Sequence, residues 1–215
     1  MKDIPVFTGT HGIATLVISP IPWSGSAYVL VRSIWTDESA FLQECLGFCR
    51  ACGAERVYAS YELAPLPAEH AYDMLALQRS KAELPAGKIP TEPLTRENAH
   101  EFLAVYDSCF RQIPNAAPYG QRDVERLLQE ETAVLVRRDG RCAAIAQVSR
   151  QGLEAIAVLP QYRGLGYDLA LTALHMVPSM TLQLKTASVN ERALALYKRL
   201  GFEQTAVLSR WWKLM

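Results

Sequence analysis

Two glycines and an arginine at the junction of two apolar runs are the residues of this sequence best suited to bind a phosphate. The segment LPQYRGLGYDLALTAL, residues 159–174, places Arg163, Gly164 and Gly166 directly before a helix-like run. The first N–H groups of a helix have no intrahelical acceptor, and the helix dipole makes that end positive. Glycine lets an anion approach the backbone, and a guanidinium binds phosphate oxygens. The junction is therefore predicted to hold a pyrophosphate, with an ordinary glycine-rich turn as the alternative.

A second group of residues with a regular spacing lies in SVNERALALYKRLGF, residues 188–202. Ser188 and Glu191 have the spacing of a capping box, and Asn190 is a competing N-cap. Tyr197 follows Asn190 by two helical turns, about 10 Å along the axis, so both can face one cleft. Gly201 suits a left-handed C-cap. Taken singly, Asn190 is explained as a cap and Tyr197 as a half-buried core tyrosine.

The elements that must position these residues follow from the hydrophobic pattern. Residues 85–93, PAGKIPTEP, are rich in proline and indicate a linker, with a boundary near residue 88. The sequence thus predicts two parts, residues 1–87 and 88–215. For the first part we expect strands at 12–19, 27–34 and 55–61 and helices at 37–53 and 67–84. For the second part we expect helices at 95–113, 120–131, 167–177 and 190–202, and Thr95 is expected to cap the first of them. We expect a hairpin at 132–152 and further strands at 153–159, 181–188 and 203–215. Helices between strands after an antiparallel opening indicate a mixed α/β sheet.

Composition restricts the classes of partner. The formal net charge is zero and half of the residues are apolar, which argues against nucleic-acid binding and for a sizeable core. No apolar run is long enough to span a bilayer, and the N-terminal residues lack a signal-peptide layout, so a cytoplasmic location without membrane contact is expected. Cys45, Cys49 and Cys52 share one face of a predicted helix, where small apolar core residues explain them better than a metal site does.

The two groups, in this order, resemble the GNAT superfamily of N-acetyltransferases over roughly residues 88–215. The family's Arg/Gln-x-x-Gly-x-Gly/Ala motif falls on residues 163–168, and its second helix pattern falls on Asn190, Ala193, Leu196-Tyr197 and Gly201-Phe202. The resemblance implies an α/β (α+β) fold whose mixed, mostly antiparallel sheet is flanked by helices and splayed between two central strands. It also implies a bulge in the strand at 154–159, and acetyl-CoA as cosubstrate without a metal.

The resemblance further implies roles for particular residues. The pantetheine arm would bond to the backbone of Ile156, Ala157 and Val158, and the pyrophosphate would lie on the N–H groups of Arg163, Gly164, Leu165, Gly166, Tyr167 and Asp168. Asn190 would lie near the pantetheine, with Tyr197 beside the sulfur as general acid. Glu154 is the candidate base, with a plain surface residue as the alternative, and Lys185 stands where some branches have a glutamate. Asp168 departs from the family's glycine or alanine, and we expect its side chain to turn outward.

Residues 1–87 resemble, more faintly, a degenerate half of the same fold, which would give a smaller first half in tandem with the second. The equivalent junction there reads WTDESA, so this half is not expected to bind CoA. The expected function is direct acetyl transfer to an amine, and residues 109–123 are expected to line the acceptor side. The sequence does not decide whether the acceptor is a small amine, an amino acid derivative, an aminoglycoside or a protein. It also does not decide whether the protein forms a homodimer. The alternative is a non-catalytic acyl-CoA sensor or a scaffold.

Overall fold

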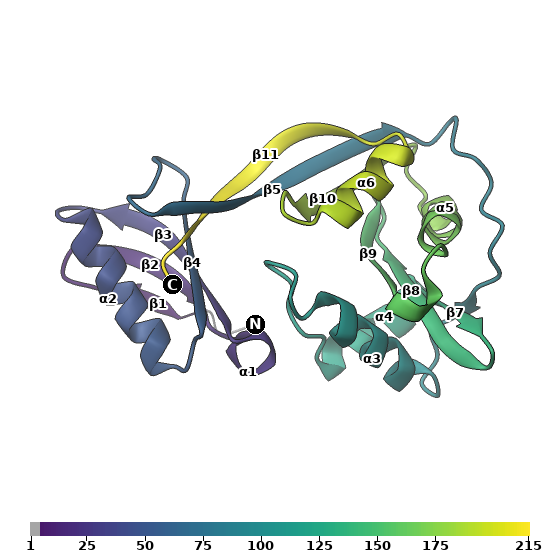
Figure 1. Ribbon diagram of the computed structural model, residues 1–215, viewed down its shortest axis with the longest axis horizontal. Coiled ribbons are helices and arrows are strands. Elements are labelled where there is room, and N and C mark those ends of the chain that lie inside the picture. Colours follow the sequence, from purple (N-terminus) through teal and green to yellow (C-terminus); the bar gives the residue numbers. More distant parts are fainter. Residues whose placement is uncertain (1–4) are drawn as a thin grey trace.

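The computed structural model describes residues 5–215 and contains two packed regions joined by two long strands (Figure 1). The first region contains β1 (Val6–Thr8), β2 (Gly12–Val17), α1 (Ile21–Ser24), β3 (Ser26–Ile34), α2 (Glu38–Ala51) and β4 (Arg56–Tyr61). The long strand β5 (Glu69–Ser80) leads out of it. The second region contains β6 (Glu92–Pro93), α3 (Ala99–Phe110), α4 (Gln121–Glu130), β7 (Ala133–Arg138), β8 (Arg141–Val148), β9 (Leu153–Val158), α5 (Gly166–Met176), β10 (Thr181–Ala187), α6 (Glu191–Arg199) and β11 (Glu203–Lys213).

The strands of the second region form a sheet that opens at its centre. One sheet has the order β6-β7-β8-β9 and is antiparallel, and the other runs β1-β2-β3-β4-β11-β5-β10. Strands β9 and β10 meet only at one end, where Gly152 bridges Gln183. A Cβ on Gly152 would lie 1.6 Å from the Gln183 carbonyl oxygen, so only glycine allows this close approach. Beyond that bridge the two strands diverge, as the predicted splay requires.

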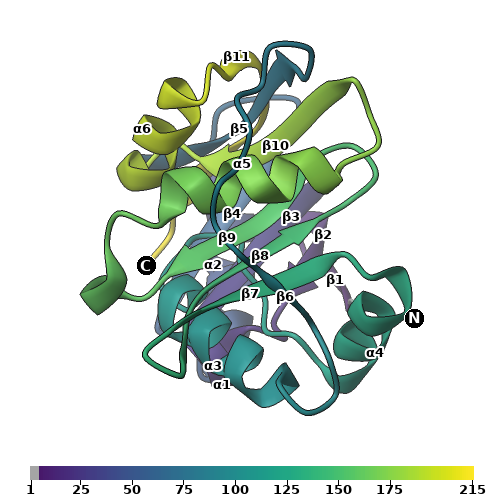
Figure 2. The same cartoon turned by 90° about the vertical axis from the view of Figure 1, so that its right-hand side faces the viewer.

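Helices cover both faces of the second region (Figure 2). Helices α3 and α4 pack on the side chains of Ala155 and Ala157, and α5 and α6 pack on the opposite face together with β10. The alternation of side chains along β9 therefore sends Ile156 and Val158 toward α5 and α6. The mostly antiparallel α/β fold flanked by helices is confirmed. Among residues 5–215, no helix could cross a membrane.

The segment 67–84, predicted as a helix, is instead the strand β5 over Glu69–Ser80, and that prediction is wrong. Strand β5 pairs antiparallel with β10 on one side and with β11 on the other. Two full ladders of backbone hydrogen bonds outweigh the weak local preference of HAYDMLALQR for a helix. Because β5 precedes the proline-rich linker yet pairs with β10, the two parts of the chain exchange a strand. The boundary near residue 88 stays a prediction.

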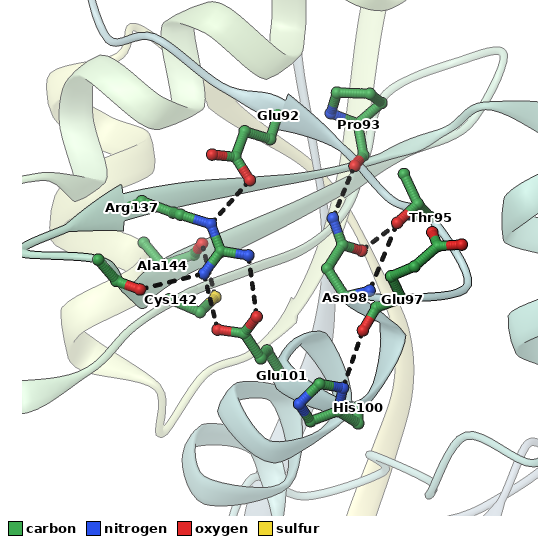
Figure 3. Close-up of polar contacts among 11 residues, drawn as sticks. Glu92, Pro93, Thr95, Glu97, Asn98, His100, Glu101, Arg137, Cys142 and Ala144 are labelled. Carbon is green, nitrogen blue, oxygen red and sulfur yellow. Dashed lines mark hydrogen bonds and ion pairs between the residues drawn. The ribbon is translucent and has the colours of Figure 1, made fainter.

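The start of α3 is fixed by a polar network different from the predicted Thr95 cap (Figure 3). Asn98 is the N-cap residue, and its side chain accepts a hydrogen bond from Thr95 N–H at 2.8 Å and donates to the Pro93 carbonyl at 3.0 Å. The guanidinium of Arg137 on β7 binds both carboxylate oxygens of Glu101 at 2.8 and 2.9 Å and also contacts Glu92. These contacts tie β6, β7 and α3 into one unit, which fixes the helix that borders the site.

The first region repeats the order strand–helix–strand as β3–α2–β4, but without an opening. Strands β3 and β4 pair in parallel from Ser26 to Val31, so no gap separates them. At the head of α2 the Asp37 carboxylate accepts a hydrogen bond from Ala40 N–H at 2.9 Å. An amide that could have bound a phosphate is thereby occupied, beside a negative charge. Cys45 and Cys49 lie buried on the core face of α2, and Cys52 is exposed.

We expect the substitution Asp37→Ala to lower the free energy of unfolding by about 0.5–2 kcal/mol, the usual cost of losing an N-cap. The affinity for acetyl-CoA should not change, because the head of α2 is not a phosphate site. Urea unfolding and calorimetric titration measure the two effects. Asp37→Asn, which keeps a capping acceptor, is the matched control. A weakened acetyl-CoA affinity in Asp37→Ala would count against this view of the first region.

Candidate active site

The head of α5 offers free backbone donors next to the opening in the sheet. The first bond of the helix runs from Leu169 N–H to the Leu165 carbonyl at 3.0 Å. The amides of Gly166, Tyr167 and Asp168 precede it, and no acceptor among residues 5–215 reaches them. With the positive end of the helix dipole, three free amides in succession suit an anion such as a pyrophosphate.

Gly164 and Gly166 have different structural reasons for being glycine. Gly164 has φ +103°, which L side chains rarely adopt, and nothing lies within 4 Å of an added Cβ. Gly166 has room for a Cβ, which would meet Val158 Cγ2 at 3.7 Å in ordinary contact. The turn thus needs glycine at 164 for its conformation, and the open space beside it is available to a ligand.

The free edge of β9 gives backbone donors and acceptors to the same opening. Leu159 N–H bonds to the Ala143 carbonyl on the β8 side, and the ladder alternates every second residue. The polar groups of Ala157 therefore point to β8, and those of Ile156 and Val158 point into the gap. Of the three backbone positions predicted to contact pantetheine, Ile156 and Val158 face the gap, and the Val158 carbonyl already accepts from the Cys109 thiol at 3.8 Å. The register shift between β8 and β9 makes Glu154 the extra residue of a bulge.

Two cavities meet along this edge and form one groove. The first, of about 300 Å³, is lined by residues that include Glu154, Lys185 and Tyr197. The second, of about 530 Å³, is lined by residues that include Ala157, Val158, Arg163, Gly164 and Gly166. Ile156, Asn190 and Ala193 line both. The groove therefore leads from the free amides of α5, past β9, to the tyrosine on α6.

Tyr197 is buried at the inner end of the groove. Its side chain is 7% exposed, and burial raises the pKa of the phenol to about 12. No residue among 5–215 forms a hydrogen bond with its hydroxyl, and the phenol lines the first cavity. At neutral pH this group is protonated, and its proton is available to a bound molecule.

Asn190 is both a cap and a groove residue. Its Oδ1 accepts a hydrogen bond from Ala193 N–H at 3.3 Å, which makes it the N-cap of α6 in place of the Ser188–Glu191 capping box. Because the same residue lines both cavities, the capping role does not remove it from the groove.

The remaining motif residues lie around the turn without lining the groove. Leu165 packs against the α5 core, and Tyr167 lies under the Arg199 guanidinium, 4.2 Å from the ring centroid. Asp168 is exposed and lines neither cavity, which agrees with the expected outward orientation.

The far wall of the first cavity comes from residues 110–119, and their aromatic partners were not predicted. Phe110 stacks on Tyr106 with ring centroids 4.5 Å apart, and Tyr119 packs against Tyr106 with tilted rings and centroids 4.3 Å apart. The hydroxyl of Tyr106 donates to the Ala117 carbonyl at 3.0 Å, so the loop is bonded to α3. Residues 109–123 were expected to line the acceptor side, and Phe110, residues 113–119 and Asp123 of this segment line the first cavity.

The first region of the chain holds this loop in place. The Asn115 N–H donates to the Tyr28 hydroxyl on β3 at 2.8 Å, and Trp23 Nε1 donates to Asp107 on α3 at 3.0 Å. Met74 of β5 also lines the first cavity. The first region therefore supports the wall of the first cavity through Tyr28 and Trp23, and β5 contributes Met74 to that wall.

Buried phenols should make the protein less stable in alkali. Burial raises the pKa of five tyrosines above the ordinary value of about 10. It also raises the pKa of two buried thiols on α2 above the ordinary value of about 8.5. Because the unfolded chain loses these protons at lower pH than the folded chain, the stability that they contribute is complete below pH 8 and falls as pH rises. The phenols are those of Tyr28, Tyr72, Tyr106, Tyr119 and Tyr197, and the thiols are those of Cys45 and Cys49.

We expect the free energy of unfolding to fall by at least about 1 kcal/mol per pH unit above pH 10. Urea unfolding between pH 7 and 11 measures this decrease, and absorbance near 295 nm follows phenol ionisation. A constant stability up to pH 11 would be the contrary result.

Comparison with solved structures places the fold. A conserved protein of unknown function from Staphylococcus epidermidis superposes with a TM-score of 0.58 at 14% identity, over 99% of this chain and 94% of that one. A GCN5-related N-acetyltransferase from Sphaerobacter thermophilus gives 0.55 at 12% identity over 94% and 75%, and a GNAT-family acetyltransferase from Colwellia psychrerythraea gives 0.53 at 14% over 97% and 83%. The fold of this chain, with its opened sheet, is therefore similar to that of solved structures described as GNAT acetyltransferases.

The sequence comparison agrees with that class. Residues 99–202 match the model described as the Acetyltransferase (GNAT) family, so this stretch of the chain is similar to a GNAT acetyltransferase domain. The matched residues begin with α3 and end after α6, so they include the free amides, the opened strands and Tyr197. The family implies acetyl transfer that depends on acyl-CoA. No curated protein matches the sequence.

Proposed function

We propose that the protein is an N-acetyltransferase that transfers acetyl directly from acetyl-CoA to an amine, with both substrates bound together. The observation that carries the proposal is the continuous groove. It joins the head of α5 at Gly166 to the gap-facing edge of β9 and reaches Tyr197. A diphosphate, an extended amide-containing arm and a thioester have complementary partners there in that order.

The residues of the groove would act in sequence along the substrate. The amides at the head of α5 and the Arg163 guanidinium bind the pyrophosphate, and the gap-facing polar groups of Ile156 bind the pantetheine arm. The N–H of Val158, which also faces the gap, donates to the thioester oxygen and stabilises the negative charge that develops on it.

Proton transfer would involve Glu154 and Tyr197. A lysine-like amine has a pKa near 10.4, so it must lose a proton before it attacks the thioester carbon. Glu154, placed by the β9 bulge on the cavity wall, accepts that proton directly or through water. A C–N bond forms, the C–S bond breaks, and Tyr197 donates its proton to the leaving thiolate.

We also propose that residues 1–87 form a degenerate half that does not bind CoA. The support is the closed β3–β4 pair and the Asp37 cap at the head of α2. In this proposal the first half serves the second by holding the acceptor loop through Tyr28 and Trp23.

The experiment that tests the proposed function is release of free thiol from acetyl-CoA across a panel of amines, combined with thermal shift with CoA. Turnover with an amine and a thermal shift with CoA support the N-acetyltransferase. A thermal shift without turnover on any amine would favour a sensor of acyl-CoA, and no thermal shift at all would favour a scaffold. A reaction without protein is the control for non-enzymatic thiol release, and Tyr197→Phe should lower the release above that background.

A further inference from the structure

We propose that the acceptor is a zwitterion, an α-amino acid with an apolar side chain. This inference rests on the proposed function as an amine N-acetyltransferase and names its substrate class. Three features of the first cavity carry it: a cation and a carboxylate that do not pair with each other, a buried amide donor without an acceptor, and an aromatic wall.

The charged residues come from the two strands that diverge at the opening. Glu154 lies on β9 and Lys185 on β10, and both line the first cavity and a smaller one of about 190 Å³ beside it. The ion pairs within residues 5–215 involve other side chains, namely His70 with Asp73, Arg126 with Glu130, and Arg137 with Glu92 and Glu101. Lys185 and Glu154 are therefore each free to bind the opposite charge of one small molecule.

A second donor on the cavity wall lacks a partner. The Nδ2 of Asn115 and the Tyr72 hydroxyl are buried beside each other, but neither completes a hydrogen bond within residues 5–215, and Asn115 lines the cavity. Its backbone has φ 60° and is held by the Tyr28 hydroxyl, so the residue has a fixed position. An unsatisfied buried donor is costly, and a ligand carboxylate would satisfy it together with the Lys185 ammonium.

The wall between these groups suits an apolar side chain. Tyr106, Phe110 and Tyr119 pack together as an aromatic cluster, and the Tyr106 and Tyr119 hydroxyls already bond to the Ala117 carbonyl and to the Gln147 side chain. The rings therefore offer apolar surface, which Ile113 and Met74 extend. The remaining carboxylate of the cavity, Asp123, accepts a hydrogen bond from Gly120 N–H at 2.9 Å.

This arrangement orients the amine for reaction. With its carboxylate at Lys185 and Asn115, the amino acid has its ammonium on the side of Glu154, which takes the proton. The freed amine attacks the thioester carbon, the C–N bond forms as the C–S bond breaks, and Tyr197 protonates the thiolate. The product is an N-acetylamino acid and CoA.

The test compares acceptors that differ in one group. L-Phenylalanine, L-methionine and L-leucine are assayed with acetyl-CoA beside phenethylamine, which lacks the carboxylate, and L-aspartate and L-lysine, which lack an apolar side chain. We expect kcat/KM for L-phenylalanine to exceed that for phenethylamine by at least ten-fold, and 3-phenylpropionate to inhibit competitively. Equal or better turnover of phenethylamine would overturn the inference while leaving the proposed function in place.

Two variants test the named donors. Lys185→Gln and Asn115→Gly, the second of which keeps the positive φ accessible, should each lower the ratio of kcat/KM for L-phenylalanine to that for phenethylamine by ten-fold or more. Lys198→Gln, an exposed lysine of α6 that lines neither cavity, is the matched control and should leave the ratio unchanged. An unchanged ratio in Lys185→Gln would also overturn the inference.

A binding measurement distinguishes failure of the proposed amino acid site from failure of the proposed N-acetyltransferase function. If no acceptor is acetylated, calorimetric titration of L-phenylalanine into the CoA-saturated protein still reports on the cavity. Binding that Lys185→Gln abolishes would support the amino acid site and reject the transferase. Absence of binding would reject both.

Discussion

Replacing Tyr197 with phenylalanine is expected to lower kcat by at least ten-fold, on the scale of about 10²–10⁴-fold that general acids contribute. The phenol lies in the groove, its pKa is raised to about 12 by burial, and its hydroxyl has no protein partner among residues 5–215. The proton is therefore retained until the thiolate departs. The KM for acetyl-CoA should change little, because the hydroxyl acts after binding. Steady-state kinetics at saturating acetyl-CoA with the best acceptor of the panel measure the effect.

A second tyrosine provides the control for the loss of a hydroxyl. Tyr61 lies at the end of β4 and packs against the core of the first region, away from the groove. Tyr61→Phe should keep wild-type kcat. A kcat of Tyr197→Phe equal to that of the wild type would refute the acid role and would point to water as the proton donor.

Placing valine at Gly164 is expected to weaken acetyl-CoA binding by at least ten-fold. Valine at φ +103° costs about 1–3 kcal/mol of backbone strain, and relief of that strain would turn the amides of the α5 head away from the pyrophosphate. The added side chain would also fill the open space that the ligand needs. Calorimetric titration with acetyl-CoA measures the loss of affinity. The milder variant Gly166→Ala adds a methyl group at a position without a positive φ and with ordinary contacts. It therefore measures the effect of crowding the ligand without the effect of backbone strain.

The matched control for this strain is Gly140 in the β7–β8 hairpin. It too has a positive φ, +73°, with nothing within 4 Å of an added Cβ, and it lies outside the groove. Gly140→Val should lower stability by a similar amount without loss of acetyl-CoA affinity. Equal affinities of Gly164→Val and the wild type for acetyl-CoA would contradict the proposed pyrophosphate site at the head of α5.

The elements of the second region could be predicted from sequence because each carries its own local signal. The Asp139-Gly140 turn fixes the hairpin with both residues at positive φ, and Gly201 ends α6 at φ +80°. Strand β5 could not be predicted in this way. Its residues become a strand only because β10 and β11, more than a hundred residues later in the chain, provide ladders on both sides.

The residues of the candidate site likewise differ in whether a local sequence pattern or a distant part of the chain determines their position. Arg163, Gly164 and Gly166 could be recognised from their spacing, and Tyr197 from its helix pattern. The diverging strands and the loop of residues 109–123 were expected beside Tyr197, but the contact from Tyr28 to Asn115 was not, because it joins residues far apart in the sequence. Only the register of β8 against β9 shows that the backbone polar groups of Ile156 and Val158 face the gap and that those of Ala157 do not.

The position of β5 between the two regions has a consequence for how the molecule unfolds and how it responds to proteolysis. In Figure 1, β5 and β11 run side by side from one region to the other, paired from Gln78 with Glu203 to Glu69 with Lys213. A fragment that started at residue 88 would lose the partner of β10 and expose a bare strand edge, which invites self-association. Neither region can melt without breaking hydrogen bonds that belong to the other, so heating should give a single cooperative transition, and a protease cut in the linker should leave the two pieces bound together.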